Sequence, residues 1–92
     1  MSTPTSSYAE LLQDGHSIIV KNFKFPSSED PDHDLLLAMA AQEMGTIIPQ
    51  ETHTYILSMG WSFEIEGLTI PHRDHPDHDI LVAEFIQKFK NK

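Results

Sequence analysis

Histidine and aspartate are concentrated in residues 72–79, whose sequence is His-Arg-Asp-His-Pro-Asp-His-Asp. Imidazole nitrogens and carboxylate oxygens are ligands of Zn²⁺ and other first-row metal ions. A helix that begins near Pro76 would place His75 and His78 one turn apart, with Asp79 close to the same side. The segment therefore predicts a divalent-metal site, although its spacing matches no established zinc signature. The candidate ligands are His72, His75, His78 and Asp79, with Asp74 as a further oxygen donor.

Part of this segment also occurs earlier in the chain, where a metal site is not expected. Pro-Asp-His-Asp occupies residues 31–34 as well as 76–79, but the earlier copy lacks the other imidazoles. Proline costs least in the first turn of a helix, and carboxylates there can cap the helix and stabilise its positive end. The shared motif is therefore typical of a helix start, and this structural interpretation competes with the metal site.

The recurrence extends over most of the chain. A shift of 45 residues aligns residues 4–44 with residues 49–89 without a gap, and 12 positions are identical. Gly15 aligns with Gly60 and Pro26 with Pro71, and these residue types are the strongest punctuators of backbone structure. We predict one domain over residues 1–92, built by tandem duplication of two repeats, approximately 1–45 and 46–92, around a pseudo-twofold axis.

The residue pattern of each repeat predicts a helix, a hairpin and a second helix, in that order, and hence an α+β fold. Ser7 and Thr52 are the expected N-caps of the short first helices. Branched and aromatic residues predict strand arms 18–20 with 23–25, and 63–65 with 68–70, around two-residue turns. One long strand per repeat is the alternative. The second helices are expected to start at Pro31 and Pro76, and we expect the four arms to form one small antiparallel sheet packed against the helices.

Composition excludes several classes of protein. The 92 residues contain 6 Lys plus Arg, 14 Asp plus Glu and no Cys, which gives a formal net charge of −8. This acidity disfavours direct nucleic-acid binding, and the lack of Cys excludes disulfides and thiolate sites. No apolar run approaches a membrane span, and the first residues do not resemble a secretory signal, so we expect a cytoplasmic protein. No nucleophile turn or glycine-rich phosphate loop is present, so we do not expect an enzyme.

The resulting functional prediction is a small acidic protein–protein interaction module. It would act as an inhibitor that occupies the basic, nucleic-acid-binding surface of a nuclease or host-defence complex. An acidic surface that serves only solubility explains the same residues. Two alternatives are a metal-binding or metal-sensing protein and a structural subunit of a larger assembly. The open edges of the predicted sheet favour a homodimer. The candidate partner-binding residues are Glu29, Asp30, Asp32, Asp34, Asp74, Asp77, Asp79 and Trp61.

Overall fold

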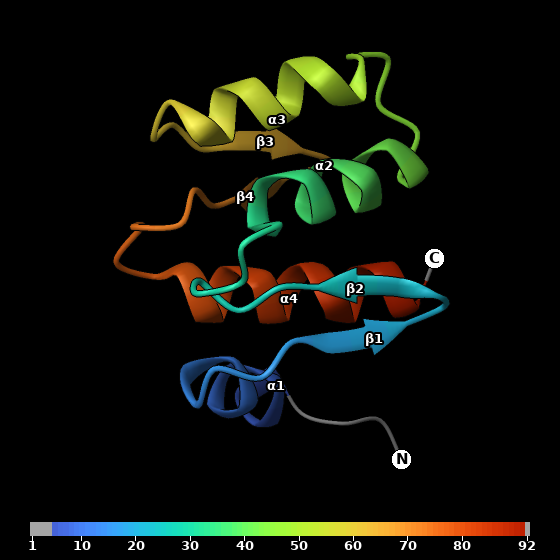
Figure 1. Cartoon of the computed structure of the whole chain (residues 1–92). Helices are drawn as coiled ribbons and strands as arrows, with labels where there is room; N and C mark the ends of the chain where they lie inside the picture. Colours follow the sequence, from blue (N-terminus) through green and yellow to red (C-terminus); the bar gives the residue numbers. More distant parts are fainter. Residues whose placement is uncertain (1–4, 92) are drawn as a thin grey trace.

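The computed structural model describes residues 5–91, and for residues 5 and 6 it describes the backbone alone. It contains four helices and four short strands (Figure 1). The first half contributes α1 (Thr5–Gln13), β1 (Ile18–Val20), β2 (Phe23–Phe25) and α2 (His33–Glu43). The second half contributes α3 (Gln50–Ser58), β3 (Phe63–Ile65), β4 (Leu68–Ile70) and α4 (His78–Lys90). The α+β class is confirmed, and each element of the second half begins 45 residues after its counterpart.

Both hairpins form, so the alternative of one long strand per half is wrong. Ile18 pairs with Phe25 and Phe63 with Ile70, and each turn has two residues. The residues in the turns have positive φ, a conformation that tight hairpin turns need and that Asn and Gly tolerate best. The φ angles are 52° and 69° at Lys21 and Asn22, and 50° and 79° at Glu66 and Gly67.

The expectation of one four-stranded sheet is wrong, because β1–β2 and β3–β4 remain separate two-stranded ladders. Each inner strand packs against the long helix of its own half, β2 on α2 and β4 on α4. The side chains of β2 also extend into the helical core, where Phe25 makes edge contacts with Phe85 and Phe89 at 5.2 Å between ring centroids. The inward faces of the hairpins are therefore covered by helices, and the two hairpins can bury their apolar side chains without pairing with each other.

The helix starts also differ from expectation. Ser7 and Thr52 lie inside α1 and α3, so neither is an N-cap. Helices α2 and α4 begin at His33 and His78, two residues after the prolines, and their N-cap aspartates make no side-chain cap hydrogen bond. A turn precedes each helix instead, in which the N–H groups of His33 and His78 donate to the carbonyls of Asp30 and His75.

One apolar cluster draws on both halves of the described chain. Helix α1 packs on α4 and α3 packs on α2, so each short helix covers the long helix of the other half (Figure 1). The apolar residues Val82, Phe85, Ile86 and Phe89 of α4 are buried, and Leu81 is half-buried. No helix in the described residues is long and apolar enough to cross a membrane.

Candidate functional site

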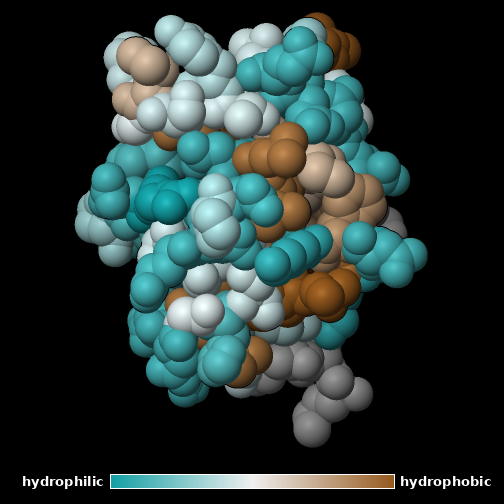
Figure 2. All heavy atoms as spheres, in the orientation of Figure 1, coloured by the Kyte–Doolittle hydropathy of each residue, from teal (hydrophilic) through white to brown (hydrophobic). Residues whose placement is uncertain are grey.

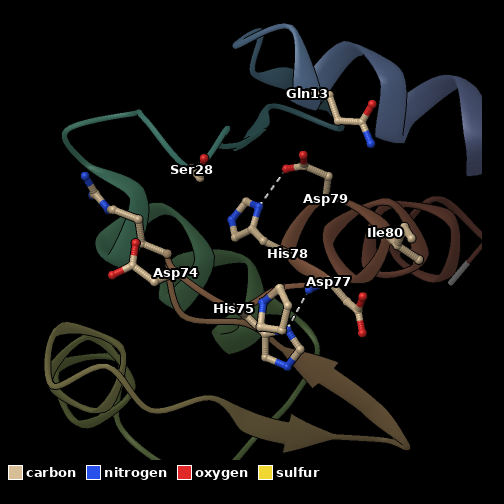
Figure 3. Close-up of a pocket in the computed structure, with 10 residues that line it drawn as sticks. Gln13, Ser28, Asp74, His75, Asp77, His78, Asp79 and Ile80 are labelled. Atoms are coloured by element: carbon tan, nitrogen blue, oxygen red, sulfur yellow. Dashed lines mark hydrogen bonds and ion pairs between the residues drawn. The ribbon is translucent and has the colours of Figure 1, made fainter.

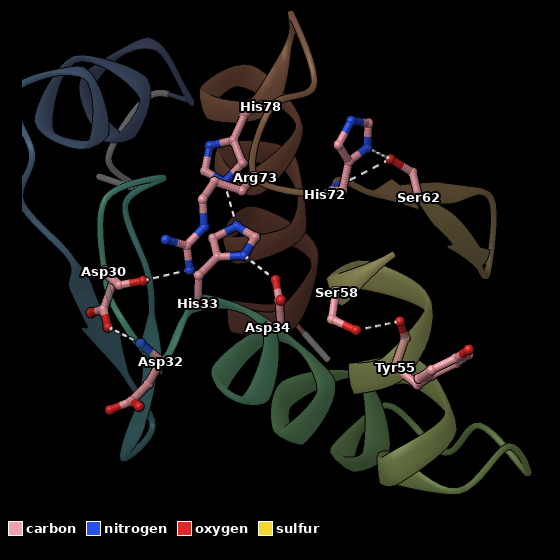
Figure 4. A network of polar contacts seen from close by, with 10 residues as sticks. All are labelled: Asp30, Asp32, His33, Asp34, Tyr55, Ser58, Ser62, His72, Arg73 and His78. Carbon is pink, nitrogen blue, oxygen red and sulfur yellow. Dashed lines mark hydrogen bonds and ion pairs between the residues drawn. The ribbon is translucent and has the colours of Figure 1, made fainter. Parts of the chain in front are cut away.

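The first turns of α2 and α4 meet at a buried histidine pair. The Nε2 atoms of His33 and His78 lie 2.7 Å apart, and the two residues are 0% and 4% exposed. Each ring also contacts the next residue in the chain. His33 Nδ1 lies 2.7 Å from Asp34 Oδ1 (Figure 4), and His78 Nδ1 lies 2.8 Å from Asp79 Oδ1 (Figure 3). These four residues form a continuous polar chain, which we call the histidine junction.

The geometry of the histidine junction constrains its protons. A carboxylate only accepts, so each Nδ1 must carry a hydrogen to satisfy its aspartate. Both Nε2 atoms would then present lone pairs to each other, unless one further proton lies between them. With neutral rings the junction has its two bonds to the aspartates, and the bond between the rings forms only if the pair takes up that extra proton. Asp34 and Asp79 favour the extra proton, and nearby Arg73, which acts on both rings, disfavours it.

Burial opposes further protonation of the pair. It is the largest cause that lowers the pKa of both His33 and His78, and the adjoining aspartates oppose it. The positive charge of Arg73 lowers both pKa values further. Coulombic interaction with His78 also lowers the pKa of His33, and interaction with His75 lowers that of His78. Two imidazolium rings at this distance are therefore strongly disfavoured.

The predicted metal ligands have other partners in this structure. His78 belongs to the histidine junction, His75 Nδ1 accepts from the Asp77 N–H at 2.9 Å, and His72 Nδ1 lies within hydrogen-bonding distance of the Ser62 hydroxyl at 2.9 Å. His75, His78 and Asp79 line a hollow of about 220 Å³, but no three His, Asp or Glu residues in the described chain are arranged to hold one metal ion (Figure 3). The metal site therefore stays a prediction.

The predicted partner-binding carboxylates differ in how far they are exposed. Asp30 is buried, where its carboxylate pairs with Lys24 at 3.1 Å. Burial raises the pKa of Asp30, but hydrogen bonds from the Asp32 N–H, Lys24 and Ser17 outweigh it and hold the pKa below its usual value. Asp34 and Asp79 are half-buried against the imidazoles. The predicted carboxylates that remain exposed are Glu29, Asp32, Asp74 and Asp77.

The exposed carboxylates lie on two loops that the fold brings together. Arg73 of the second half donates through Nη2 to the Asp30 carbonyl of the first half at 2.8 Å, beside the histidine junction (Figure 4). Residues 26–32 and 71–77 therefore form one end of the molecule, at the left in Figure 1, which we call the loop end. In the same view, the face over this end is mostly hydrophilic, and the hydrophobic residues gather toward the right (Figure 2).

A second exposed feature was only partly predicted. Trp61 is 70% exposed, Tyr55 64% and Met59 58%, and with Ile56 they line a hollow of about 290 Å³, which we call the aromatic hollow. The sequence singled out Trp61 alone. The i, i+4 spacing of Tyr55 and Met59 was an available signal that they share a helix face. Next to Trp61, the Ser62 hydroxyl accepts from the His72 N–H at 3.0 Å, which ties the aromatic hollow to the loop end (Figure 4).

Comparison of the chain with protein-family models, with curated proteins and with solved structures finds no match.

Proposed function

We propose that this protein is an acidic interaction module that binds the basic surface of a protein partner through its loop end. The observation that carries the proposal is that Glu29, Asp32, Asp74 and Asp77 are exposed on two loops held together by the Arg73 contact. A concrete form of this function is an inhibitor that occupies the nucleic-acid-binding groove of a nuclease or host-defence complex. Its carboxylates would take the place of phosphates and speed association by long-range attraction.

The placement of the cations supports the proposal. In the described chain, Lys24 and Arg73 contact Asp30, Lys88 and Lys21 contact backbone carbonyls, and Lys90 contacts the Tyr8 hydroxyl. No ion pair among the described residues involves the four exposed carboxylates of the loop end. Their charge is therefore available to a partner.

We also propose that the chain is a tandem duplication with a pseudo-twofold axis, working as one domain in the cytoplasm. The constant offset of 45 residues between corresponding elements supports this origin. So does the histidine junction, which joins equivalent residues of the two halves. The duplicated acidic loops would double the charge presented at one end.

The direct test compares two variants with the same change in net charge. D32N/D74N/D77N neutralises the loop end, and E10Q/E66Q/E84Q neutralises three exposed carboxylates on other elements. Partners recovered from the native cell, and then purified, should bind the first variant at least about tenfold more weakly than wild type, with affinity that falls as salt rises. The second variant should bind like wild type. Equal weakening by both variants would reject the loop end as the binding surface.

A further inference from the structure

The aromatic hollow is a property of the second half alone. Tyr55, Met59 and Trp61 correspond, 45 residues earlier, to Glu10, Asp14 and His16, which are all exposed. The same backbone elements, the end of a short helix and its glycine turn, therefore fold with polar residues at these positions. The fold does not require large apolar side chains there, and leaving them exposed forgoes the free energy of burial.

The residue types fit an interaction pocket. Tyr, Trp and Met are enriched at protein interfaces, where aromatic residues contribute large contact areas with little loss of side-chain entropy. Tyr55, Ile56, Met59 and Trp61 supply the whole lining of the hollow, so its interior suits an apolar group. Its volume of about 290 Å³ has room for one large side chain such as Leu, Met or Phe.

Charge complementarity indicates what kind of chain carries that side chain. Ser62 links Trp61 to His72, and His72 leads directly to Arg73 and the exposed carboxylate of Asp74. A second copy of this protein would bring its own net charge of −8 to this acidic region. A lysine- or arginine-rich segment would instead pair with the loop end while its apolar residue entered the hollow.

We propose that the aromatic hollow is the anchoring pocket for one apolar side chain of a basic segment of a protein partner. This inference rests on the proposed function and names the chemistry of the partner. It predicts that binding has two separable components, charge attraction at the loop end and apolar burial at Tyr55, Met59 and Trp61.

The chain contains a single tryptophan, so Trp61 reports directly on the occupancy of the hollow. We would titrate the full chain with a fluorescently labelled lysine-rich peptide that has one central leucine. An otherwise identical peptide has alanine at the centre. Label anisotropy measures binding, and Trp61 emission, measured with unlabelled peptide, measures occupancy. The leucine peptide should bind about tenfold more tightly than the alanine peptide and should shift Trp61 emission to the blue.

The first half supplies a matched variant, Y55E/M59D, which introduces the residues found at Glu10 and Asp14 and keeps Trp61 as the reporter. This variant should bind both peptides with equal affinity, since its added charges cannot weaken attraction to lysine. The control I19E changes an exposed apolar residue on β1 and should keep the preference for leucine. Equal affinities and unchanged emission for the two peptides with wild type would overturn the pocket. If binding still depended on Asp32, Asp74 and Asp77, the proposed function would stand without it.

Two other results would also overturn the inference. A blue shift of Trp61 that grows with protein concentration, without peptide, would identify a second copy as the occupant. Failure of both peptides to bind at low salt would reject the pocket and the basic partner together.

Discussion

The C-terminal ends of α1 and α3 carry different residues, whereas the residues that join the two halves are alike. At the end of α1 stand Glu10, Asp14 and His16, and at the end of α3 stand Tyr55, Met59 and Trp61. In contrast, the equivalent positions 33 and 78 are both histidine, and these two side chains are buried and in contact with each other. Identity at this junction therefore marks residues that hold the two halves together, and divergence at the helix ends marks the aromatic hollow that we propose as the anchoring pocket.

Breaking the histidine junction should have the largest effect. H33L removes one partner and leaves His78 buried without its Nε2 contact, so we expect a loss of about 3 kcal/mol in the free energy of unfolding. The double variant H33L/H78L replaces both polar rings and should cost clearly less than the sum of the single variants. Denaturant unfolding measures all three. Additive losses, or single losses below about 0.5 kcal/mol, would show that the two rings are not coupled.

The same junction predicts a loss of stability in acid. Because burial lowers the folded-state pKa of His33 and His78 below the ordinary value of 6.5, the unfolded chain binds more protons as the pH falls. The contribution of the two histidines to the free energy of unfolding is therefore complete above about pH 6.5 and is lost as the pH falls below it. The loss is up to about 1.4 kcal/mol per pH unit for each proton taken up on unfolding.

Unfolding free energies measured from pH 7.5 to 5 check this, with H33L/H78L as the reference. The double variant should lose less stability over this range than wild type. The residual slope should include His53, whose pKa burial also lowers. Identical slopes would exclude the histidine junction as the cause.

Two equivalent serines should differ in their contribution. The Ser17 hydroxyl donates to the buried carboxylate of Asp30 at 3.1 Å, whereas the Ser62 hydroxyl contacts ring Nδ1 of His72 at 2.9 Å. Hydrogen bonds to charged groups are stronger, so S17A should cost about 2 kcal/mol and S62A about 1 kcal/mol. Thermal melts of the two variants provide the comparison, and the reverse order would show that Lys24 and the Asp32 N–H hold Asp30 without a contribution from Ser17.

The smallest effect is expected in the hairpin turns. Asn22 has φ of 69° where the second half has Gly67 at 79°. Glycine carries no steric penalty at positive φ, so N22G should raise the free energy of unfolding by on the order of 0.5 kcal/mol. A loss of stability in chemical denaturation would mean that the Asn22 side chain contributes more than its backbone strain costs.

The sequence predicted features that depend on neighbouring residues. The strand arms follow from branched and aromatic residues on each side of Lys21-Asn22 and Glu66-Gly67, and the buried face of α4 follows from helical spacing. The prediction that four arms would join failed because sheet formation depended on where Phe25 could pack, which is a tertiary property.

The sites were harder to predict for the same reason. Pro-Asp-His-Asp does contain a helix start, two residues later than predicted, but its histidines were not expected to be buried. The contact between His33 and His78 spans 45 residues, and no local pattern encodes it. The available signal was that a histidine, which surface capping does not require, occupies the same place in both halves. Tyr55 and Met59 were missed because an exposed apolar pair is recognised only once the core is known.

The most direct test of the central claim is a map of amide chemical shifts in the full chain during titration with the lysine-rich leucine peptide. The account predicts that residues 55–61 and 72–77 shift together with saturating peptide, while residues 10–16 at the end of α1 remain unchanged. Equal shifts at both helix ends, or shifts confined to residues 10–16, would contradict the claim that the partner is bound by the aromatic hollow together with the loop end.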